Sequence, residues 1–288
     1  MNISGKTKVI ALLGSPVAHS LSPAMHNAAF KAAGLDYVYI ALPVSPVMVK
    51  EAIMGLRALN LAGANVTIPH KEAVIPCLDE ISEDAQKIGA VNTIVVSEER
   101  LKGHNTDVYG FLRSLEEGGA RIKNAQFIII GAGGAARAMA FGAALNMASS
   151  IVITDVVQEK ADALAGNIKK AVPGIAVLST APESEEFRQS LMRADVVANA
   201  TPLGMNGNDP IPLSQELMAK LPSSAVVFDA VYAKHETPFL KSAADLGLRP
   251  IGGLNMLLYQ GARSFELWTG IKPDENLMKN VLNQRFRI

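Results

Sequence analysis

The sequence predicts an α/β protein in which most strands are parallel. Short runs of β-branched and apolar residues alternate with helical patterns along most of the chain, which is the order of elements that gives sheets covered by helices. In the second half, a glycine-rich turn joins an apolar run to an alanine-rich helix. Beyond Gly252 the pattern is helical only. We therefore expect two βα blocks followed by C-terminal helices.

The composition is that of a globular protein without a strongly charged partner. The chain has 288 residues, which is enough for two domains, with 49% hydrophobic and 19% charged residues. Because the formal net charge is zero, nothing favours binding to nucleic acid or to an anionic membrane. Cys77 is the single cysteine, so no intrachain disulfide forms and a reducing compartment is expected. No apolar stretch has the length of a membrane span. We expect a cytoplasmic monomer or homodimer that acts on a small molecule.

Four strands are predicted in the first block, at residues 8–14, 37–42, 62–68 and 90–96. Two helices between them are expected to begin at Ser22-Pro23 and Ser45-Pro46, because a hydroxyl caps a helix and proline suits its first turn. Gly34 suits the left-handed residue that ends the first helix.

The second block begins near residue 126, with apolar runs at 126–130, 150–155, 174–179, 194–202 and 225–232 that we interpret as strands. The pattern then predicts helices over residues 254–270 and 274–282. A helix over residues 106–117 is expected to connect the two blocks. This order predicts a second α/β unit with its own parallel sheet.

A dinucleotide fingerprint follows the first of these strands. Gly131, Gly133 and Ala136 have the G-x-G-x-x-A spacing, which permits a tight turn, lets the backbone approach a pyrophosphate and packs the helix closely on the strand. A glycine-rich turn that holds no ligand is the alternative. The residues expected to face the cofactor here are Gly131, Ala132, Gly133, Gly134 and Ala135.

Asp155 ends the next predicted strand, 24 positions after Gly131. An acidic side chain there can accept hydrogen bonds from a ribose and repels a 2′-phosphate. The residues that follow include no arginine, and Lys160 is the nearest basic residue. We therefore expect NAD to be preferred, with NADP as the other cofactor. Alternatively, Asp155 only caps the helix that follows.

Polar side chains gather at the ends of strands and in loops of the first block. The segments "AHSLSP", "NVTIPHK", "GAVNT" and "GHNTD" supply hydroxyl and amide groups, which a polyol needs because each buried hydroxyl must be paired. Lys71 and Asp107 are the two charges that we single out for proton handling.

Each of these residues also has a purely structural interpretation. Ser20 and Ser22 suit a helix cap, and Asn65 and Thr67 suit hydrogen bonds within their own turn. Asp107 would stabilise a helix start without catalysis, and Lys71 would be one more solvated lysine. The remaining polar candidates are histidines without a metal-ligand spacing, so no metal site is expected; they are His19, His26, His70 and His104.

Together the motifs resemble those of the shikimate dehydrogenase family over nearly the whole chain. They occur in the family's order: "GSPVAHSLSPAMHN", "NVTIPHK", "GAVNT", "NTDVYGF", "GAGGAARA", "NATPLGM", "DAVY" and "GGLNMLLYQGARSFELWTG". The resemblance implies a two-lobe α/β fold with reversible hydride transfer between shikimate and 3-dehydroshikimate. Residues 1–106 and 254–288 would form the substrate-binding catalytic domain, and residues 107–253 the Rossmann domain.

The resemblance also implies roles for individual residues. Lys71 and Asp107 match the catalytic pair. Negative charge develops on the substrate oxygen as hydride reaches a carbonyl carbon, so an ammonium group can stabilise that charge and donate the proton. Ser20 and Ser22 would bind the substrate carboxylate. The other substrate ligands would be Asn65, Thr67, Asn92, Tyr232 and Gln260, and further cofactor contacts would come from Thr201, Met205, Val231, Gly253 and Met256.

Three other functions remain open at this point. Asp155 is also typical of NAD-linked relatives that oxidise quinate to 3-dehydroquinate, although the Ser20-x-Ser22 pair resembles shikimate-selective members. A non-catalytic dinucleotide-binding regulatory protein is disfavoured because Lys71 and Asp107 are both present. A methylenetetrahydrofolate dehydrogenase-like enzyme shares the two-lobe plan, but clustered Ser, Thr and Asn side chains suit a polyol better than a pteridine.

Overall fold

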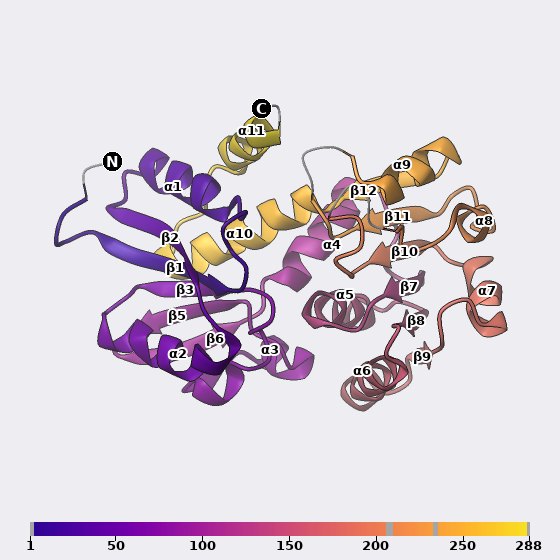
Figure 1. Cartoon of the computed structure of the whole chain (residues 1–288), viewed down its shortest axis with the longest axis horizontal. Coiled ribbons are helices and arrows are strands. Elements are labelled where there is room, and N and C mark those ends of the chain that lie inside the picture. The colour runs from indigo at the N-terminus through magenta and orange to yellow at the C-terminus, as the bar shows by residue number, and fades with distance from the viewer. Residues whose placement is uncertain (1–2, 206–209, 233–235, 287–288) are drawn as a thin grey trace. The chain divides into compact units, whose positions relative to one another are not determined.

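A computed structural model describes residues 3–205, 210–232 and 236–286 (Figure 1). The chain divides into two compact units, one of residues 1–110 and 257–288 and the other of residues 111–256. The predicted domain boundaries, 106/107 and 253/254, lie within a few residues of these. Two helices continue from one unit into the other: α4 (Asp107–Glu117) and α10 (Gly253–Thr269).

In the described residues, the first unit contains a six-stranded mixed sheet of order β2-β1-β3-β5-β6-β4. The β1–β2 and β1–β3 pairs are parallel, whereas β5 runs antiparallel to both β3 and β6. Parallel pairing places the ends of β1 and β3 at the same edge, where the last five residues of "NVTIPHK", from Thr67 to Lys71, follow β3. The strands are β1 (Lys8–Gly14), β2 (Tyr37–Pro43), β3 (Gly63–Val66), β4 (Glu80–Ile81), β5 (Thr93–Ser97) and β6 (Arg100–His104).

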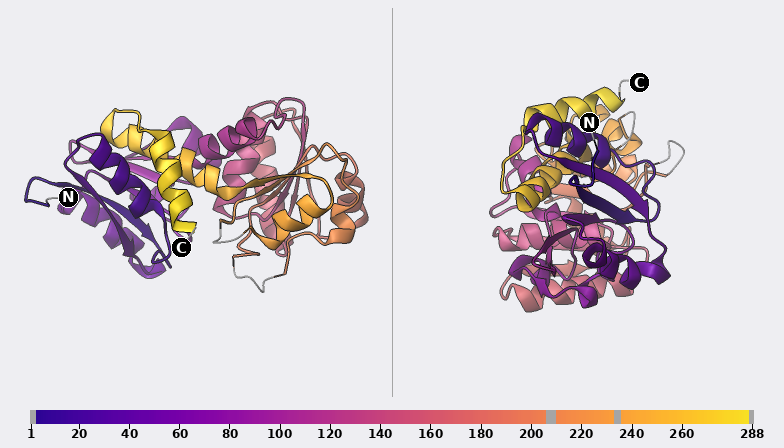
Figure 2. Two further views of the ribbon diagram at one scale, coloured as in Figure 1. Left: turned by 90° about the horizontal axis from the view of Figure 1, so that it is seen from above. Right: turned by 90° about the vertical axis from the view of Figure 1, so that its left-hand side faces the viewer.

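Helices cover both faces of this sheet. Ile53 and Leu56 of α2 pack with Ala11, Leu13 and Val66 on one face. On the other, Phe30 of α1 stacks on Phe265 of α10 with ring centroids 4.9 Å apart, and α11 lies beside α1 (Figure 2). The helices of this unit are α1 (Ser22–Ala32), η1 (Pro46–Met48), α2 (Val49–Ala58), η2 (Ile75–Cys77), α3 (Glu83–Ile88) and α11 (Glu275–Phe286), with the C-terminal part of α10.

The described part of the second unit contains a six-stranded sheet of order β12-β11-β10-β7-β8-β9, in which every pair is parallel. The chain moves outward from β7 in both directions, first to β8 and β9 and then to β10, β11 and β12. Such a reversal creates a ligand-binding crevice at the carboxyl ends of the central strands. The strands are β7 (Gln126–Ile130), β8 (Ser150–Thr154), β9 (Ala176–Ser179), β10 (Val196–Asn199), β11 (Val226–Asp229) and β12 (Arg249–Gly252).

Helices α5 and α6 lie on one side of this sheet and α7, α8 and α9 on the other (Figure 1). Ile128, Val152 and Val227 form the core with Phe187 and Phe239 on the α7–α9 side. These apolar, β-branched strands are buried on both faces, as in doubly wound sheets. The helices are α5 (Gly134–Leu145), α6 (Gln158–Ala171), α7 (Glu185–Leu191), α8 (Gln215–Met218) and α9 (Pro238–Asp245).

The predicted strands are present: β1 and β7 have the predicted bounds, β2 is one residue longer, and the others have shorter or shifted bounds. Three strands, β4, β6 and β12, were not predicted. The β5 and β6 strands form an antiparallel hairpin that turns at Glu98 and Glu99, both with positive φ. Two short strands, β4 and β12, also escaped prediction because each has a charged or proline-containing sequence. The expectation of largely parallel strands holds for the second sheet and only for part of the first.

The predicted helix start at Ser22 is correct in position but wrong in mechanism. Leu21 occupies the N-cap position of α1 and its side chain makes no capping hydrogen bond. The Ser20 hydroxyl, not that of Ser22, accepts from the first N–H group of the helix, at Ser22. Ser45 precedes η1 without a capping hydrogen bond either. Gly34 does adopt the left-handed conformation just past the end of α1, with φ +65°, as expected for a glycine there. The Ser22 hydroxyl is therefore not committed to capping.

Candidate active site

Lys71 and Asp107 form a close and largely shielded ion pair in the first unit. Lys71 Nζ donates to Asp107 Oδ2 at 2.6 Å, and the two side chains are 13% and 8% exposed. The turn that carries Lys71 is joined to the segment before β5, because the Lys71 carbonyl accepts from the Val91 N–H at 2.8 Å. Asn105 caps the start of α4 through the N–H groups of Asp107 and Val108. The Asp107 carboxylate therefore faces Lys71 and does not serve as the helix cap.

Asn92 orients this pair. Its Oδ1 accepts from the Thr106 N–H at 2.7 Å, and a backbone N–H can only donate. Its Nδ2 is consequently turned toward Asp107 Oδ1, 2.9 Å away, and toward Gln260 Oε1, 3.4 Å away. The buried Asn92 carboxamide thus contacts two other predicted site residues, Asp107 and Gln260, and Asp107 in turn contacts Lys71. The cluster offers one cation, one anion and neutral amide groups, a set suited to a hydroxylated substrate.

Asn65 lies deeper in the same unit. Tyr39 Oη donates to its Oδ1 at 2.8 Å, and its Nδ2 faces Asn92 O, Thr93 Oγ1 and Ser264 Oγ at 3.0–3.1 Å. These partners are distant in sequence, so the interpretation that Asn65 bonds only within its own turn is wrong. Both N–H groups are engaged, which leaves Oδ1 as the atom able to accept a substrate hydroxyl.

Sequence reasoning missed a group of buried hydroxyls behind Asn92. Ser264 is fully buried on α10, and its Oγ lies 2.8 Å from Thr93 Oγ1 and 3.1 Å from Thr106 Oγ1. The signal was available in part, because Ser264 follows Gln260 by one helical turn and so shares its face. The threonines adjoin Asn92 and Asp107 in the "GAVNT" and "NTD" motifs.

The remaining predicted substrate ligands of the first unit lie in loops or at the start of a helix. Ser20 Oγ accepts from the Ser22 N–H at 3.3 Å, so the two hydroxyls belong to one turn at the start of α1. Ser22 is 6% exposed. Thr67 follows β3, and its N–H donates to Leu13 O at 2.8 Å. Their contacts with a substrate stay predictions.

In the second unit, the predicted cofactor ligands follow five different strands of one parallel sheet. Because the strands are parallel, these segments share the carboxyl edge of the sheet. The glycine-rich segment, residues 131–135, follows β7 and Asp155 follows β8. The remaining residues are Thr201 and Met205 after β10, Val231 after β11, Gly253 after β12 and Met256 in the first turn of α10.

The glycines of this edge fit a cofactor cradle. Gly131 has φ +108°, which favours glycine, and a Cβ on Gly133 would meet no atom within 4 Å. The open space at Gly133 leaves room for a pyrophosphate at the start of α5. Gly253, by contrast, has no room for a side chain, because a Cβ there would lie 2.8 Å from the backbone oxygen of Asp229. Ala136 is fully buried, which agrees with close packing of α5 on the sheet.

Asp155 is held against the glycine-rich segment. Its Oδ2 accepts from the Ala132 N–H at 2.7 Å and its Oδ1 from the Val157 N–H at 2.9 Å. Val157, not Asp155, is the N-cap residue of α6. Val156 beside it is 92% exposed. The carboxylate is thus fixed by two backbone groups, and each oxygen keeps a lone pair for a ligand hydroxyl.

Two buried polar residues shape the loops at this edge. Asn199 Nδ2 donates to Asp229 Oδ1 at 2.8 Å, and Thr201 Oγ1 donates to Asn199 Oδ1 at 2.7 Å. Asp229 Oδ1 also accepts from the Val231 N–H at 3.0 Å. Burial raises the pKa of Asp229, against the opposing effect of its hydrogen bonds from Thr237, Val231 and Asn199.

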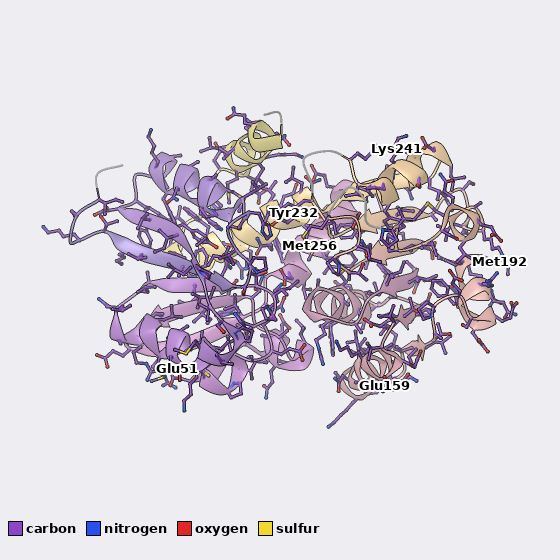
Figure 3. All side chains as sticks on the ribbon, viewed as in Figure 1. Glu51, Glu159, Met192, Tyr232, Lys241 and Met256 are labelled. Carbon is purple, nitrogen blue, oxygen red and sulfur yellow. The ribbon has the colours of Figure 1, made fainter. Side chains whose placement is uncertain are left out.

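Tyr232 and Met256, labelled in Figure 3, also belong to the second unit. Tyr232 follows β11, and burial raises the pKa of its phenol, so the hydroxyl is protonated at neutral pH and can donate a hydrogen bond. The structure therefore places Tyr232 in a different unit from the other predicted substrate ligands. Its substrate role stays a prediction.

Among the described residues, no three His, Cys, Asp or Glu side chains cluster as metal ligands. His70 Nε2 lies 2.7 Å from Val44 O, and His26 is enclosed by aromatic rings. In the same part of the chain, no helix has the length and apolar character needed to cross a membrane.

Two family models match the chain: the shikimate dehydrogenase substrate binding domain at residues 12–94 and the shikimate 5′-dehydrogenase C-terminal domain at residues 253–282. The shikimate dehydrogenase (NADP+) of Methanocaldococcus jannaschii is 45% identical, with 97% of this chain and 98% of that protein covered.

Solved structures agree. The Listeria monocytogenes shikimate 5-dehydrogenase, in complex with shikimate and NAD, is 36% identical with a TM-score of 0.89, and 98% of each chain is covered. The Corynebacterium glutamicum quinate dehydrogenase in complex with NAD is 34% identical with a TM-score of 0.86, covering 96% of this chain and 98% of that one. The chain therefore belongs to the shikimate dehydrogenase family of oxidoreductases.

Proposed function

We propose that this protein catalyses reversible hydride transfer between shikimate and 3-dehydroshikimate, with NAD as the preferred cofactor. The observation that carries the proposal is the shielded Lys71–Asp107 pair, oriented by Asn92 and adjoined by Gln260. Family membership supports the reaction, since relatives over nearly the full length are named for it.

Lys71 supplies the proton in the reduction direction. An ammonium carries three N–H donors, and Asp107 Oδ2 accepts one of them. As hydride adds to the carbonyl carbon, the carbonyl electron pair moves onto oxygen, and a Lys71 N–H stabilises that charge and transfers its proton. In the oxidation direction, the substrate hydroxyl returns this proton to the amine. Asp107, held by Asn92, keeps the lysine in place for both directions.

The neutral groups around the pair suit the rest of the substrate. Gln260 and Thr67 would bind ring hydroxyls, and Asn65 would accept from one through its Oδ1. Ser20 and Ser22 would hold the carboxylate through two hydroxyl donors on one turn. Such a site pairs each polar group of the polyol, and it discriminates strongly against analogues that lack one of them.

The second unit would hold the dinucleotide, which supplies the hydride acceptor or donor. Gly133 leaves space for the pyrophosphate and Asp155 presents a carboxylate fixed by the Ala132 and Val157 N–H groups. That carboxylate would accept from the adenosine ribose, whereas the 2′-phosphate of NADP would face its negative charge. The exposed Val156 offers no cation to neutralise the phosphate. This supports NAD preference even though the Methanocaldococcus relative is named for NADP+.

Steady-state kinetics with shikimate and quinate, each with NAD and NADP, tests the proposal. We expect shikimate with NAD to give the highest kcat/KM, with NAD favoured over NADP by about tenfold or more, which corresponds to about 1.4 kcal/mol. Quinate as the better substrate would instead assign the chain to the function of the Corynebacterium relative. No turnover of either substrate would refute the proposed reaction, and a preference for NADP would refute the role of Asp155.

A further inference from the structure

Tyr39 occupies the middle of β2, the outer strand of the first sheet. An outer strand leaves alternate backbone N–H and C=O groups without a strand partner. At Tyr39, the side chain of Asn27 from α1 satisfies both groups. Its Oδ1 accepts from the Tyr39 N–H at 2.8 Å, and its Nδ2 donates to the Tyr39 C=O at 2.9 Å. Only one orientation of the Asn27 carboxamide makes both bonds, and this pair of hydrogen bonds joins α1 to β2.

His26, the preceding residue of α1, reinforces this connection through the Tyr39 ring. The two rings stack with centroids 4.5 Å apart and an interplanar angle of 15°, and Trp268 meets the imidazole edge-on at 5.4 Å. Burial lowers the pKa of His26 to about 3. The imidazole is therefore neutral at physiological pH, and the contact is a stack of uncharged rings.

The phenol hydroxyl of Tyr39 reaches toward the candidate active site. Its Oη donates to Asn65 Oδ1 at 2.8 Å, and the sheet order β2-β1-β3 shows that this bond passes over β1. Asn65 in turn donates to Asn92 O at 3.0 Å. The Asn92 side chain donates to Asp107, so hydrogen bonds made by Asn65 and by the backbone and side chain of Asn92 link Tyr39 to the ion pair.

From these contacts we infer that Asn27 and Tyr39 are positioning residues, which hold the start of α1, and with it Ser20 and Ser22, in a defined place relative to Asn65. The role of the serines in this inference rests on the proposed function. Ser22 precedes Asn27 by five residues, about 7.5 Å along the helix axis. A helix moves as a rigid element, so release of Asn27 from β2 shifts the serines without removing any group that would touch the substrate.

Asn27→Leu tests this role, because leucine has a similar volume and makes neither hydrogen bond. Misplaced binding groups weaken an interaction even when all are present, so we expect the KM for shikimate to rise about tenfold. The kcat should change less than about twofold and the KM for the dinucleotide should not change. If Asn27 acts through Ser22, then Asn27→Leu should have little further effect in a Ser22→Ala background, since coupled residues are not additive.

Tyr39→Phe provides a second test that keeps the ring stack and the backbone bonds to Asn27. It removes only the donor to Asn65 Oδ1, and we expect a smaller rise in the KM for shikimate. Tyr37→Phe is the matched control, because Tyr37 lies two residues earlier on β2 and stacks on Phe30 at 5.1 Å. Its kinetics should equal those of the wild type. Thermal unfolding of each variant shows whether the fold survives.

The outcomes separate this inference from the proposed function. A wild-type protein that does not oxidise shikimate overturns the proposed function and, with it, the role of Asn27. An active wild type with an unchanged KM in both Asn27→Leu and Tyr39→Phe overturns the positioning role alone. Additive effects of Asn27→Leu and Ser22→Ala on the KM for shikimate would also overturn the positioning role. If Asn27→Leu does not fold, the comparison of Tyr39→Phe with Tyr37→Phe decides the question.

Discussion

The Lys71 ammonium and the Asp107 carboxylate lie 2.6 Å apart with side chains 13% and 8% exposed. Lys87 and Glu83 show the same 2.6 Å separation on α3, but their side chains are 38% and 81% exposed. An exposed pair of this kind contributes little to stability because water and salt screen it. The Lys71 pair is shielded and adjoins the buried amide of Asn92, which distinguishes a candidate catalytic pair from a surface one.

Lys71→Ala should lower kcat by about a hundredfold or more, the usual scale for loss of a positioned proton donor. Substrate binding should be retained in part, because the amide and hydroxyl ligands remain. Steady-state kinetics and calorimetric titration with shikimate measure the two effects separately. Lys87→Ala is the control with the same chemical change, and it should leave kcat unaltered. Similar kcat values for the two variants would show that Lys71 takes no part in the reaction.

Ser22→Ala should raise the KM for shikimate more than it lowers kcat, because the carboxylate is remote from the reacting carbon. Since the Ser22 hydroxyl does not cap α1, the free energy of unfolding should change by less than about 0.5 kcal/mol. Ser184 provides the contrast, because it caps α7 by accepting from the Phe187 N–H at 3.1 Å.

Ser184→Ala should therefore lower the free energy of unfolding by about 1 kcal/mol and leave the KM unchanged. Urea denaturation and kinetics on both variants complete the comparison. A destabilised Ser22→Ala protein with normal KM would return Ser22 to a structural role.

Asp155→Ser combined with Val156→Arg should narrow or reverse the preference for NAD. The change removes a charged acceptor, and hydrogen bonds to charged groups contribute about 1.5–3 kcal/mol. It also supplies a guanidinium for a 2′-phosphate. The measurement is the ratio of kcat/KM for NAD and NADP. Asp162→Ser is the control, because it removes the same charge from an exposed position on α6, and it should keep the wild-type ratio. If the wild type, the double variant and Asp162→Ser all had the same ratio, Asp155 would not determine the cofactor preference.

Folding stability should depend on pH through His26. Burial lowers its pKa from 6.5 to about 3, so between these values the unfolded chain binds a proton that the folded chain does not. The contribution to stability is present above about pH 6.5 and is lost as pH falls toward 3, by up to about 1.4 kcal/mol per pH unit.

His26→Phe keeps an aromatic ring against Tyr39 and removes this titration. Its free energy of unfolding, from urea denaturation between about pH 7 and about pH 4.5, should decrease less steeply than that of the wild type. Parallel curves for His26→Phe and the wild type would contradict the assignment.

Local sequence was sufficient to predict the strands and turns that depend mainly on neighbouring residues. Apolar runs predicted β7, β8, β10 and β11, and the spacing of Gly131, Gly133 and Ala136 predicted the turn and helix between β7 and β8. These residues act on their immediate neighbours through backbone conformation and close packing, so their pattern is visible without the fold. The same holds for Lys71 and Asp107 as candidates, because each stands at the polar end of a recognisable element.

Only the tertiary structure decided which polar groups meet. Asn65 and Ser264 are 199 positions apart and form a hydrogen bond at 3.1 Å, and Asn27 reaches Tyr39 because α1 packs along β2. Likewise, β6 has no strong strand signal and forms because β5 and β4 offer unpaired edges on either side. Long-range pairings depend on how helices and strands are arranged in space. The sequence therefore determined the chemical groups of the site, while packing determined their partners and orientation.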